Sequence, residues 1–111
     1  MKIFRCKACF YLHEGEDAPD FCPKCGAPKE QFELLDENIT GLIIRSRKSN
    51  ALLMTSITML KELQNLAKEG INDNLDPSCL NYFQRVAECS DLLKKIAMAE
   101  IQSHIAKNKW G

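Results

Sequence analysis

The chain has 111 residues and sets 15 lysines and arginines against 15 aspartates and glutamates, so it carries no formal net charge. This is about the size of one compact domain and excludes a large multidomain enzyme. Apolar residues make up 45% and charged residues 27%, a composition that excludes disorder and collagen-like fibres. Neither half has the basic excess typical of nucleic-acid binding, so nucleic acid is not an expected partner.

Two parts of the sequence, its most apolar stretch and its first residues, indicate where in the cell the protein is found. No run approaches the roughly 20 apolar residues that a membrane helix needs, because Arg45, Arg47 and Lys48 follow Ile44. The first residues lack the apolar segment and the small-residue cleavage site of a secretory signal. We therefore expect a soluble, cytoplasmic protein with no membrane partner.

The types of residue change sharply near residue 36. Four of the six cysteines and three of the four prolines come before it. A segment of fewer than about 40 residues seldom folds on a hydrophobic core alone and normally needs a disulfide or metal staple. The sequence therefore predicts two domains, a metal-bound module over residues 1–35 and an α-helical part over residues 36–111.

The first domain contains two C-x2-C pairs, at residues 6–9 and 22–25, separated by twelve residues. Two tight knuckles at this spacing place four thiolates tetrahedrally around one ion. In a reducing cytosol such cysteines favour metal over disulfides, and the alternative of a redox-active dithiol does not need two matched pairs. The spacing does not distinguish iron from zinc. The predicted metal ligands are Cys6, Cys9, Cys22 and Cys25.

In the second domain apolar residues recur mostly at three- and four-residue steps, as in an amphipathic helix. We expect this helix to stop at Gly70, with a turn-rich link over residues 71–75. Asp76 and Pro77 suit the N-cap and the first position of a second helix, which should reach about Asn108. Because the link is short, the two helices should form an antiparallel hairpin.

The predicted hairpin carries more apolar residues than one seam between two helices buries. On the first helix they cover a broad arc between Leu52 and Leu60. Self-association of two chains into a four-helix bundle would bury this surplus, and the sequence therefore predicts a homodimer. The alternative is that the surplus packs on the N-terminal module of the same chain.

Residues 4–32 carry a resemblance that goes beyond cysteine spacing. An aromatic residue lies two before the first cysteine and a tyrosine two after the second, a Gly-Glu-x-Ala-Pro turn occupies residues 15–19, and residues 22–29 read Cys-Pro-x-Cys-Gly-Ala-Pro-Lys. With these features the segment resembles the short rubredoxin-like domain of rubrerythrins. The order, with this module first, resembles the reversed type of rubrerythrin.

This resemblance implies a mononuclear iron centre, with one Fe(2+/3+) per chain, that shuttles one electron. Zinc is the alternative occupant, especially in recombinant protein. The implied ligands are Cys6, Cys9, Cys22 and Cys25. The expected fold is a small α+β metal-bound module of the rubredoxin-like, zinc-ribbon-like kind, followed by the antiparallel two-helix hairpin.

One residue departs from the family pattern. Phe10 stands where the family usually has Gly, directly after the second cysteine. A β-carbon at a positive-φ position costs of order 1 to 3 kcal/mol. We therefore expect either a reshaped first knuckle or a strained Phe10, whose ring would also shield the metal from water.

The helical half departs from the family as well. Rubrerythrins hold a di-iron site through Glu-x-x-His motifs, but the residues three before His13 and His104 are Phe10 and Ile101. Glu100 and His104 share a helix face, and we expect an ion pair or hydrogen bond there rather than a degenerate metal site in a dimer. With no such motif, we do not expect a stand-alone enzyme.

The remaining candidate residues have structural interpretations. His13 should be a surface residue rather than a ligand, since four cysteines are available. Cys79 and Cys89 should be buried free thiols. We expect the aromatic residues of the module to form its core rather than an electron path. These aromatic residues are Phe4, Tyr11, Phe21 and Phe32.

Together these features predict an electron-transfer or redox-accessory protein that works with a redox partner protein. The alternative is a zinc-stapled helical adapter without redox activity, because zinc has no redox chemistry. Basic residues should gather where the helices meet the metal module, where they either steer an acidic partner or form a solvated helix end. These basic residues are Arg45, Arg47, Lys48, Lys107 and Lys109.

Overall fold

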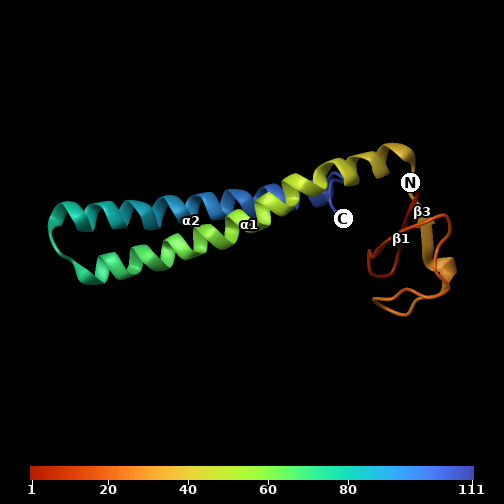
Figure 1. Ribbon diagram of the computed structural model, residues 1–111, viewed down its shortest axis with the longest axis horizontal. Coiled ribbons are helices and arrows are strands. Elements are labelled where there is room, and N and C mark those ends of the chain that lie inside the picture. The colour runs from red at the N-terminus through yellow and green to blue at the C-terminus, as the bar shows by residue number, and fades with distance from the viewer. The chain divides into compact units, whose positions relative to one another are not determined.

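Three short strands and one 3-10 turn make up the N-terminal part of the computed structural model, which describes residues 1–111 (Figure 1). They are β1 (Ile3–Cys6), β2 (Leu12–Glu14), the turn η1 (Lys29–Gln31) and β3 (Phe32–Leu34). The sheet is antiparallel in the order β2-β1-β3. Because Cys6 ends the central strand opposite Phe32, the sheet holds the first cysteine in a fixed place.

The core of this N-terminal part is small and aliphatic. Ile3, Leu35 and Ile43 are almost fully buried, and Leu12 and Ile39 pack against them. Ile39 and Ile43 belong to the first turns of helix α1 (Glu37–Asp73), where a spacing of four residues puts both on one face. The start of α1 therefore completes the core of the metal module.

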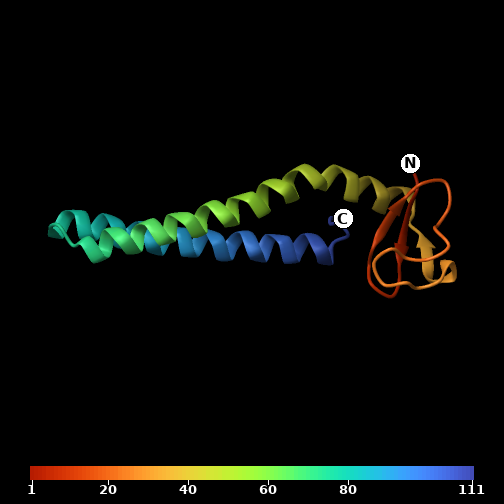
Figure 2. The same cartoon turned by 60° about the horizontal axis from the view of Figure 1, so that its bottom comes forward.

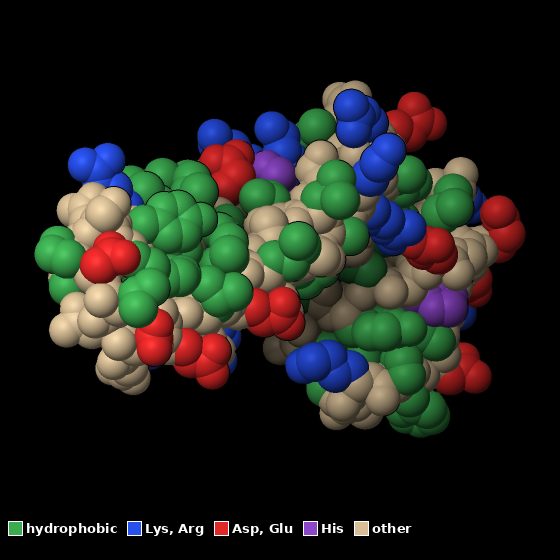
Figure 3. Space-filling model, turned by 60° about the vertical axis from the view of Figure 1, so that its left-hand side comes forward, with side chains coloured by type: hydrophobic (Ala, Val, Ile, Leu, Met, Phe, Trp, Pro, Cys, Tyr) green, Lys and Arg blue, Asp and Glu red, His purple; other side chains and the backbone are tan.

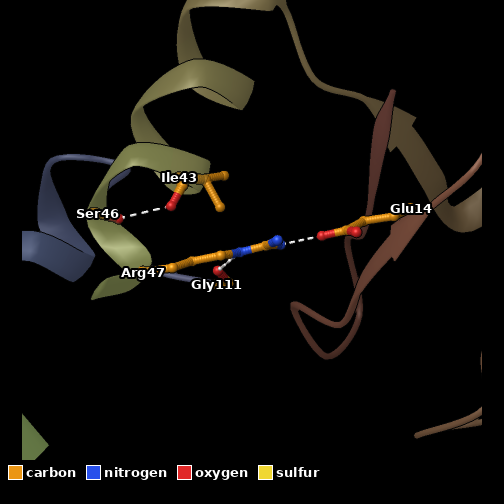
Figure 4. Close-up of polar contacts among 5 residues, drawn as sticks. All are labelled: Glu14, Ile43, Ser46, Arg47 and Gly111. Carbon is orange, nitrogen blue, oxygen red and sulfur yellow. Dashed lines mark hydrogen bonds and ion pairs between the residues drawn. The ribbon is translucent and has the colours of Figure 1, made fainter. Parts of the chain in front are cut away.

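Polar contacts add to this packing, as Figure 4 shows. The Arg47 guanidinium pairs with the Glu14 carboxylate, and its Nε donates to the Gly111 carbonyl oxygen at 2.8 Å. The Ser46 hydroxyl donates to the Ile43 carbonyl oxygen at 2.9 Å, so this buried hydroxyl is satisfied within its own helix. Arg47 was expected either to steer a partner or to lie at a solvated helix end, and its guanidinium instead contacts Glu14 and Gly111.

The chain forms two compact units, residues 1–47 with 108–111 and residues 48–107. The second unit is a hairpin in which α1 and α2 (Pro77–Ala106) lie side by side and antiparallel in both views (Figures 1 and 2). The most deeply buried side chains of its seam are small or short, which lets the two backbones approach. The buried seam residues are Asn50, Ala67, Ser90 and Ala97.

The link between the helices differs from the prediction. The first helix does not stop at Gly70 but continues to Asp73, and the residue in the left-handed conformation is Asn74, with φ 47°. The start of α2 follows the prediction, because the Asp76 carboxylate accepts a hydrogen bond from the Cys79 N–H at 2.8 Å and Pro77 is the first helical residue. This cap satisfies one of the free N–H groups of the helix.

The predicted architecture is confirmed in its main lines: a three-stranded antiparallel module bearing four cysteines, then an antiparallel two-helix hairpin. None of the helices has the length and apolarity that a membrane span requires. The domain boundary between residues 35 and 36 and the four-helix bundle stay predictions.

Candidate metal centre

The first cysteine pair lies on a tight knuckle between β1 and β2. The Phe10 N–H donates to the Cys6 carbonyl oxygen, and the Cys6 N–H donates to the Tyr11 carbonyl oxygen, both at 2.8 Å. Closing this turn requires Phe10 to adopt a φ of 67°, a conformation that favours glycine. Phe10 therefore accepts the strain, and the alternative of a reshaped knuckle is wrong.

The second cysteine pair repeats the same turn. The Gly26 N–H donates to the Cys22 carbonyl oxygen, and the Cys22 N–H donates to the Ala27 carbonyl oxygen, again both at 2.8 Å. Gly26 has a φ of 77°, so it is the counterpart of Phe10. The second knuckle therefore has a glycine at its positive-φ position.

The Phe10 side chain does not act as expected. It is 73% exposed, so most of the ring faces solvent instead of covering the sulfurs. The expected shielding of a metal ion by this ring is wrong. The first knuckle therefore differs from the second in its backbone strain and not in how well the sulfurs are shielded from water.

The two knuckles bring all four sulfurs together. The Sγ atoms of Cys6 and Cys25 are 3.7 Å apart, those of Cys9 and Cys22 are 3.6 Å apart, and all four lie within 4.8 Å of one another. Four sulfurs bound at about 2.3 Å to one ion would lie about 3.8 Å apart in a regular tetrahedron. The donor set therefore fits a single tetrahedral metal ion of the iron or zinc kind.

The pKa values of these thiols also favour the binding of a cation. At Cys9 the Tyr11 N–H lowers the pKa, but desolvation and the neighbouring thiols outweigh it and raise the pKa to about 12. At Cys22 desolvation acts to raise the pKa, but the N–H groups of Cys25 and Lys24, with the neighbouring thiols, lower it to about 7. Adjacent thiolates repel one another unless a cation lies between them, and metal binding displaces the remaining protons.

The sulfurs differ in exposure. Cys6 and Cys22, the first cysteines of the two knuckles, are 0% and 3% exposed. Cys9 is half-buried and Cys25 is exposed. One side of the centre is therefore sealed by the protein, and the other side reaches the surface.

The other candidate side chains lie outside this cluster. His13 is half-buried in β2, paired with Phe4, and does not join the cysteines. His104 Nε2 contacts the Glu100 carboxylate at 3.2 Å, as the expected pair, and His104 Nδ1 lies 2.6 Å from the Asn50 side-chain oxygen. The cysteines are the one group of three or more potential ligands that the structure brings together.

Three sequence-based expectations about packing are corrected. Phe21, expected in the core, is 69% exposed. Cys89 is exposed and Cys79 is half-buried, so neither is a fully buried thiol. Sequence reasoning also missed the contribution of Ile39 and Ile43 to the module, because helical periodicity alone assigns both to the hairpin. Aliphatic side chains from α1 therefore fill the core that aromatic residues were expected to fill.

Comparison with known proteins agrees with this geometry. A family model of the rubrerythrin rubredoxin-like domain matches residues 4–33. The reverse rubrerythrin-1 of Clostridium acetobutylicum is 55% identical over 38 residues, which are 33% of this chain and 21% of that protein. The rubrerythrin of Nitratidesulfovibrio vulgaris is 54% identical over 35 residues, which are 32% of this chain and 18% of that protein.

These likenesses are local. Each aligned segment spans about one fifth of the length of the curated relative that it matches. No solved structure matches the chain significantly. Residues 4–33 thus form a four-cysteine metal site of the rubredoxin-like class, a kind typical of iron binding. More particularly, they are a rubrerythrin rubredoxin-like domain, and a hairpin of two long helices follows it.

Proposed function

We propose that this protein is a one-electron carrier, or an electron-transfer accessory of a larger redox system, with one iron ion bound by Cys6, Cys9, Cys22 and Cys25. One observation carries the proposal: four sulfurs converge to within 4.8 Å of one another, two pairs of them at 3.7 and 3.6 Å, inside a domain that a rubrerythrin rubredoxin-like family model matches. When bound in such a site, iron supplies reversible one-electron chemistry between its ferrous and ferric states.

The protein's own part is to stabilise the charge on the sulfurs. The Tyr11 N–H donates to the Cys9 sulfur, and the N–H groups of Lys24 and Cys25 donate to the Cys22 sulfur. Hydrogen bonds to thiolate sulfur disperse negative charge and are one of the main means by which proteins tune a thiolate-bound metal. Because the turns fix these N–H donors, the protein should rearrange little when the metal centre gains or loses one electron.

Electrons would enter and leave at the exposed side of the centre. Cys9 and Cys25 reach the surface there, while Cys6 and Cys22 are sealed. Lys7 and Lys24, one in each knuckle, are exposed. A redox partner protein with an acidic docking patch would bring its own cofactor close to this edge, and the lysines would speed their encounter at low salt.

We propose that the protein carries electrons and does not itself catalyse a reaction. The helices lack the Glu-x-x-His motif with which rubrerythrins bind two irons. Glu100 and His104 engage each other and Asn50 rather than a further carboxylate. A partner would therefore carry out the substrate chemistry.

Metal content and the visible spectrum of protein purified from an iron-replete host test this proposal. We expect one iron per chain and visible charge-transfer bands that bleach with dithionite. Cys9→Ser should lose or strongly shift the bands, whereas Cys89→Ser, an exposed cysteine on α2, should leave them unchanged. One zinc per chain despite ample iron, with no visible bands, would contradict the proposal and favour a zinc-stapled adapter.

A further inference from the structure

One face of the hairpin leaves large apolar side chains without a partner in the chain. Leu52, Met59 and Leu66 on α1 are 61%, 61% and 50% exposed, although nearby Asn50 and Ala67 are buried in the seam. These three residues follow one another at steps of seven, and each step turns the side chain by only about 20° around a helix. They form a straight apolar row along α1, distinct from the seam.

The second helix contributes to the same face. An apolar groove of about 510 Å³ is lined from α1 by Met59 and Leu63 and from α2 by Leu93 and Ile96. Leu93 and Ile96 are each more than half exposed. Figure 3 shows hydrophobic side chains gathered over the near part of the hairpin. We call this surface, made by Leu52, Met59, Leu63, Leu66, Leu93 and Ile96, the apolar face.

We propose that the apolar face binds a second copy of this chain, in an antiparallel four-helix bundle whose two-fold axis passes at Met59. The row on α1 reads the same in both directions about Met59, because Leu52 and Leu66 each lie seven residues from it. A two-fold axis there opposes Met59 to Met59 and Leu52 to the Leu66 of the second copy. Such self-complementarity is what an isologous dimer requires.

The charges beside the row have the matching arrangement. Lys48 lies at one end and Glu69 at the other, on the side of the row away from the seam, and neither forms an ion pair within its own chain. Turning the second copy about Met59 brings Lys48 of each chain close to Glu69 of the other. A parallel pairing would instead oppose like charges, lysine to lysine and glutamate to glutamate, which is unfavourable.

The one charged side chain on the groove does not oppose this packing. Glu100 lines the groove, and its carboxylate already has a partner in His104 Nε2 at 3.2 Å.

The apolar face is also large enough for a stable interface. Two neighbouring helices of about 24 residues present a footprint of about 36 Å by 20 Å, close to the roughly 800 Å² per partner of a stable interface.

Sedimentation equilibrium of the full, metal-loaded chain tests the proposal. We expect a mass of twice 12.6 kDa at micromolar concentration. Met59→Lys places two unpaired charges in contact at the axis and should raise the dissociation constant at least about 100-fold. Met54→Lys is the matched control, because Met54 is also exposed on α1 but lies about 140° around the helix from Met59, and it should leave the dimer intact.

A charge exchange tests the direction of pairing. Lys48→Glu and Glu69→Lys should each weaken the dimer by roughly 3- to 10-fold, and the double variant should recover the wild-type dissociation constant. These surface changes leave the fold intact, so they remain informative even if Met59→Lys lowers the helical circular dichroism.

Three outcomes would overturn the proposal. A wild-type chain that stays monomeric at about 100 μM would exclude the dimer. Equal dissociation by Met54→Lys and Met59→Lys would exclude the apolar face as the interface. A double charge variant weaker than both single variants would exclude the antiparallel two-fold at Met59.

Discussion

At the scale of single residues, the two knuckles are the same turn built with different side chains. Phe10 and Gly26 have φ values of 67° and 77°, and their N–H groups make equivalent hydrogen bonds to Cys6 and Cys22. Glycine adopts this conformation at no steric cost, while any other L-residue is strained there. One knuckle therefore holds its cysteine pair at a conformational cost that the other does not have.

Phe10→Gly should stabilise the protein. The strain relieved is about 1 to 3 kcal/mol. The extra freedom of glycine in the unfolded chain lowers this gain in stability by about 0.5 to 1 kcal/mol. Because the Phe10 ring is 73% exposed, little packing is lost. We expect the free energy of unfolding to rise by about 1 kcal/mol in guanidinium titrations of the metal-loaded protein.

Gly26→Ala is the control for this change. A β-carbon at Gly26 would have no atom within 4 Å, so its effect is conformational alone and should lower the free energy of unfolding by about 1 kcal/mol. A destabilised Phe10→Gly protein beside a neutral Gly26→Ala protein would show that the positive φ values carry no cost.

At the scale of elements, the hairpin depends on close approach near its tip. A β-carbon on Gly70 would lie 2.3 Å from the Phe83 ring, so this glycine is where α2 packs on α1. Read along the sequence, Gly70 is typical of a helix end. The structure uses it inside the helix, because the ring that fills the space comes from a residue thirteen positions later, which local patterns do not reveal.

Gly70→Ala should therefore destabilise the hairpin although alanine is the better helix former. The clash with Phe83 forces the helices apart at a cost of about 1 to 3 kcal/mol, which exceeds the gain in helix propensity of about 1 kcal/mol. Gly41→Ala, in the same helix with nothing within 4 Å, should raise the thermal midpoint. Circular dichroism melts check both, and a higher midpoint for Gly70→Ala would refute the packing argument.

Other parts of the elements were predictable for a physical reason. The Asp76-Pro77 start of α2 is encoded locally, by a carboxylate that reaches the Cys79 N–H and by a proline at a position where no N–H is needed. The cysteine knuckles are local as well, since each closes within six residues. The sequence predicted both because they depend on neighbours along the chain.

At the scale of the whole molecule, the N-terminal module has only a small core, so a metal ion bound by its four cysteines would have to supply much of its stability. Only Ile3, Leu35 and Ile43 form its buried aliphatic cluster. Ile43 could not be assigned to this cluster from the sequence, because its periodicity fits the hairpin equally well. Phe21 was wrongly placed in the core, because residue type predicts only a tendency to be buried. The contacts in the folded chain decide which residues are buried.

Removal of the metal should unfold the module and spare the hairpin. A core of this size seldom sustains a fold without a metal or disulfide, whereas α1 and α2 have a seam of their own. Trp110 is the single tryptophan and belongs to the same compact unit as the module. After chelation we expect a shift of its fluorescence, most of the helical circular dichroism retained, and recovery of both on adding metal. Unchanged fluorescence in metal-free protein would contradict this role.

The most direct test of the central claim is a potentiometric titration of the iron-loaded protein, followed by its visible absorption. A one-electron iron centre should give a single reversible wave with the slope of a one-electron process and an amplitude equal to one iron per chain. Phe10→Gly and Cys89→Ser should keep this wave, and Cys9→Ser should lose or displace it. Protein from an iron-replete host that holds zinc and gives no wave at any potential would contradict a role in electron transfer.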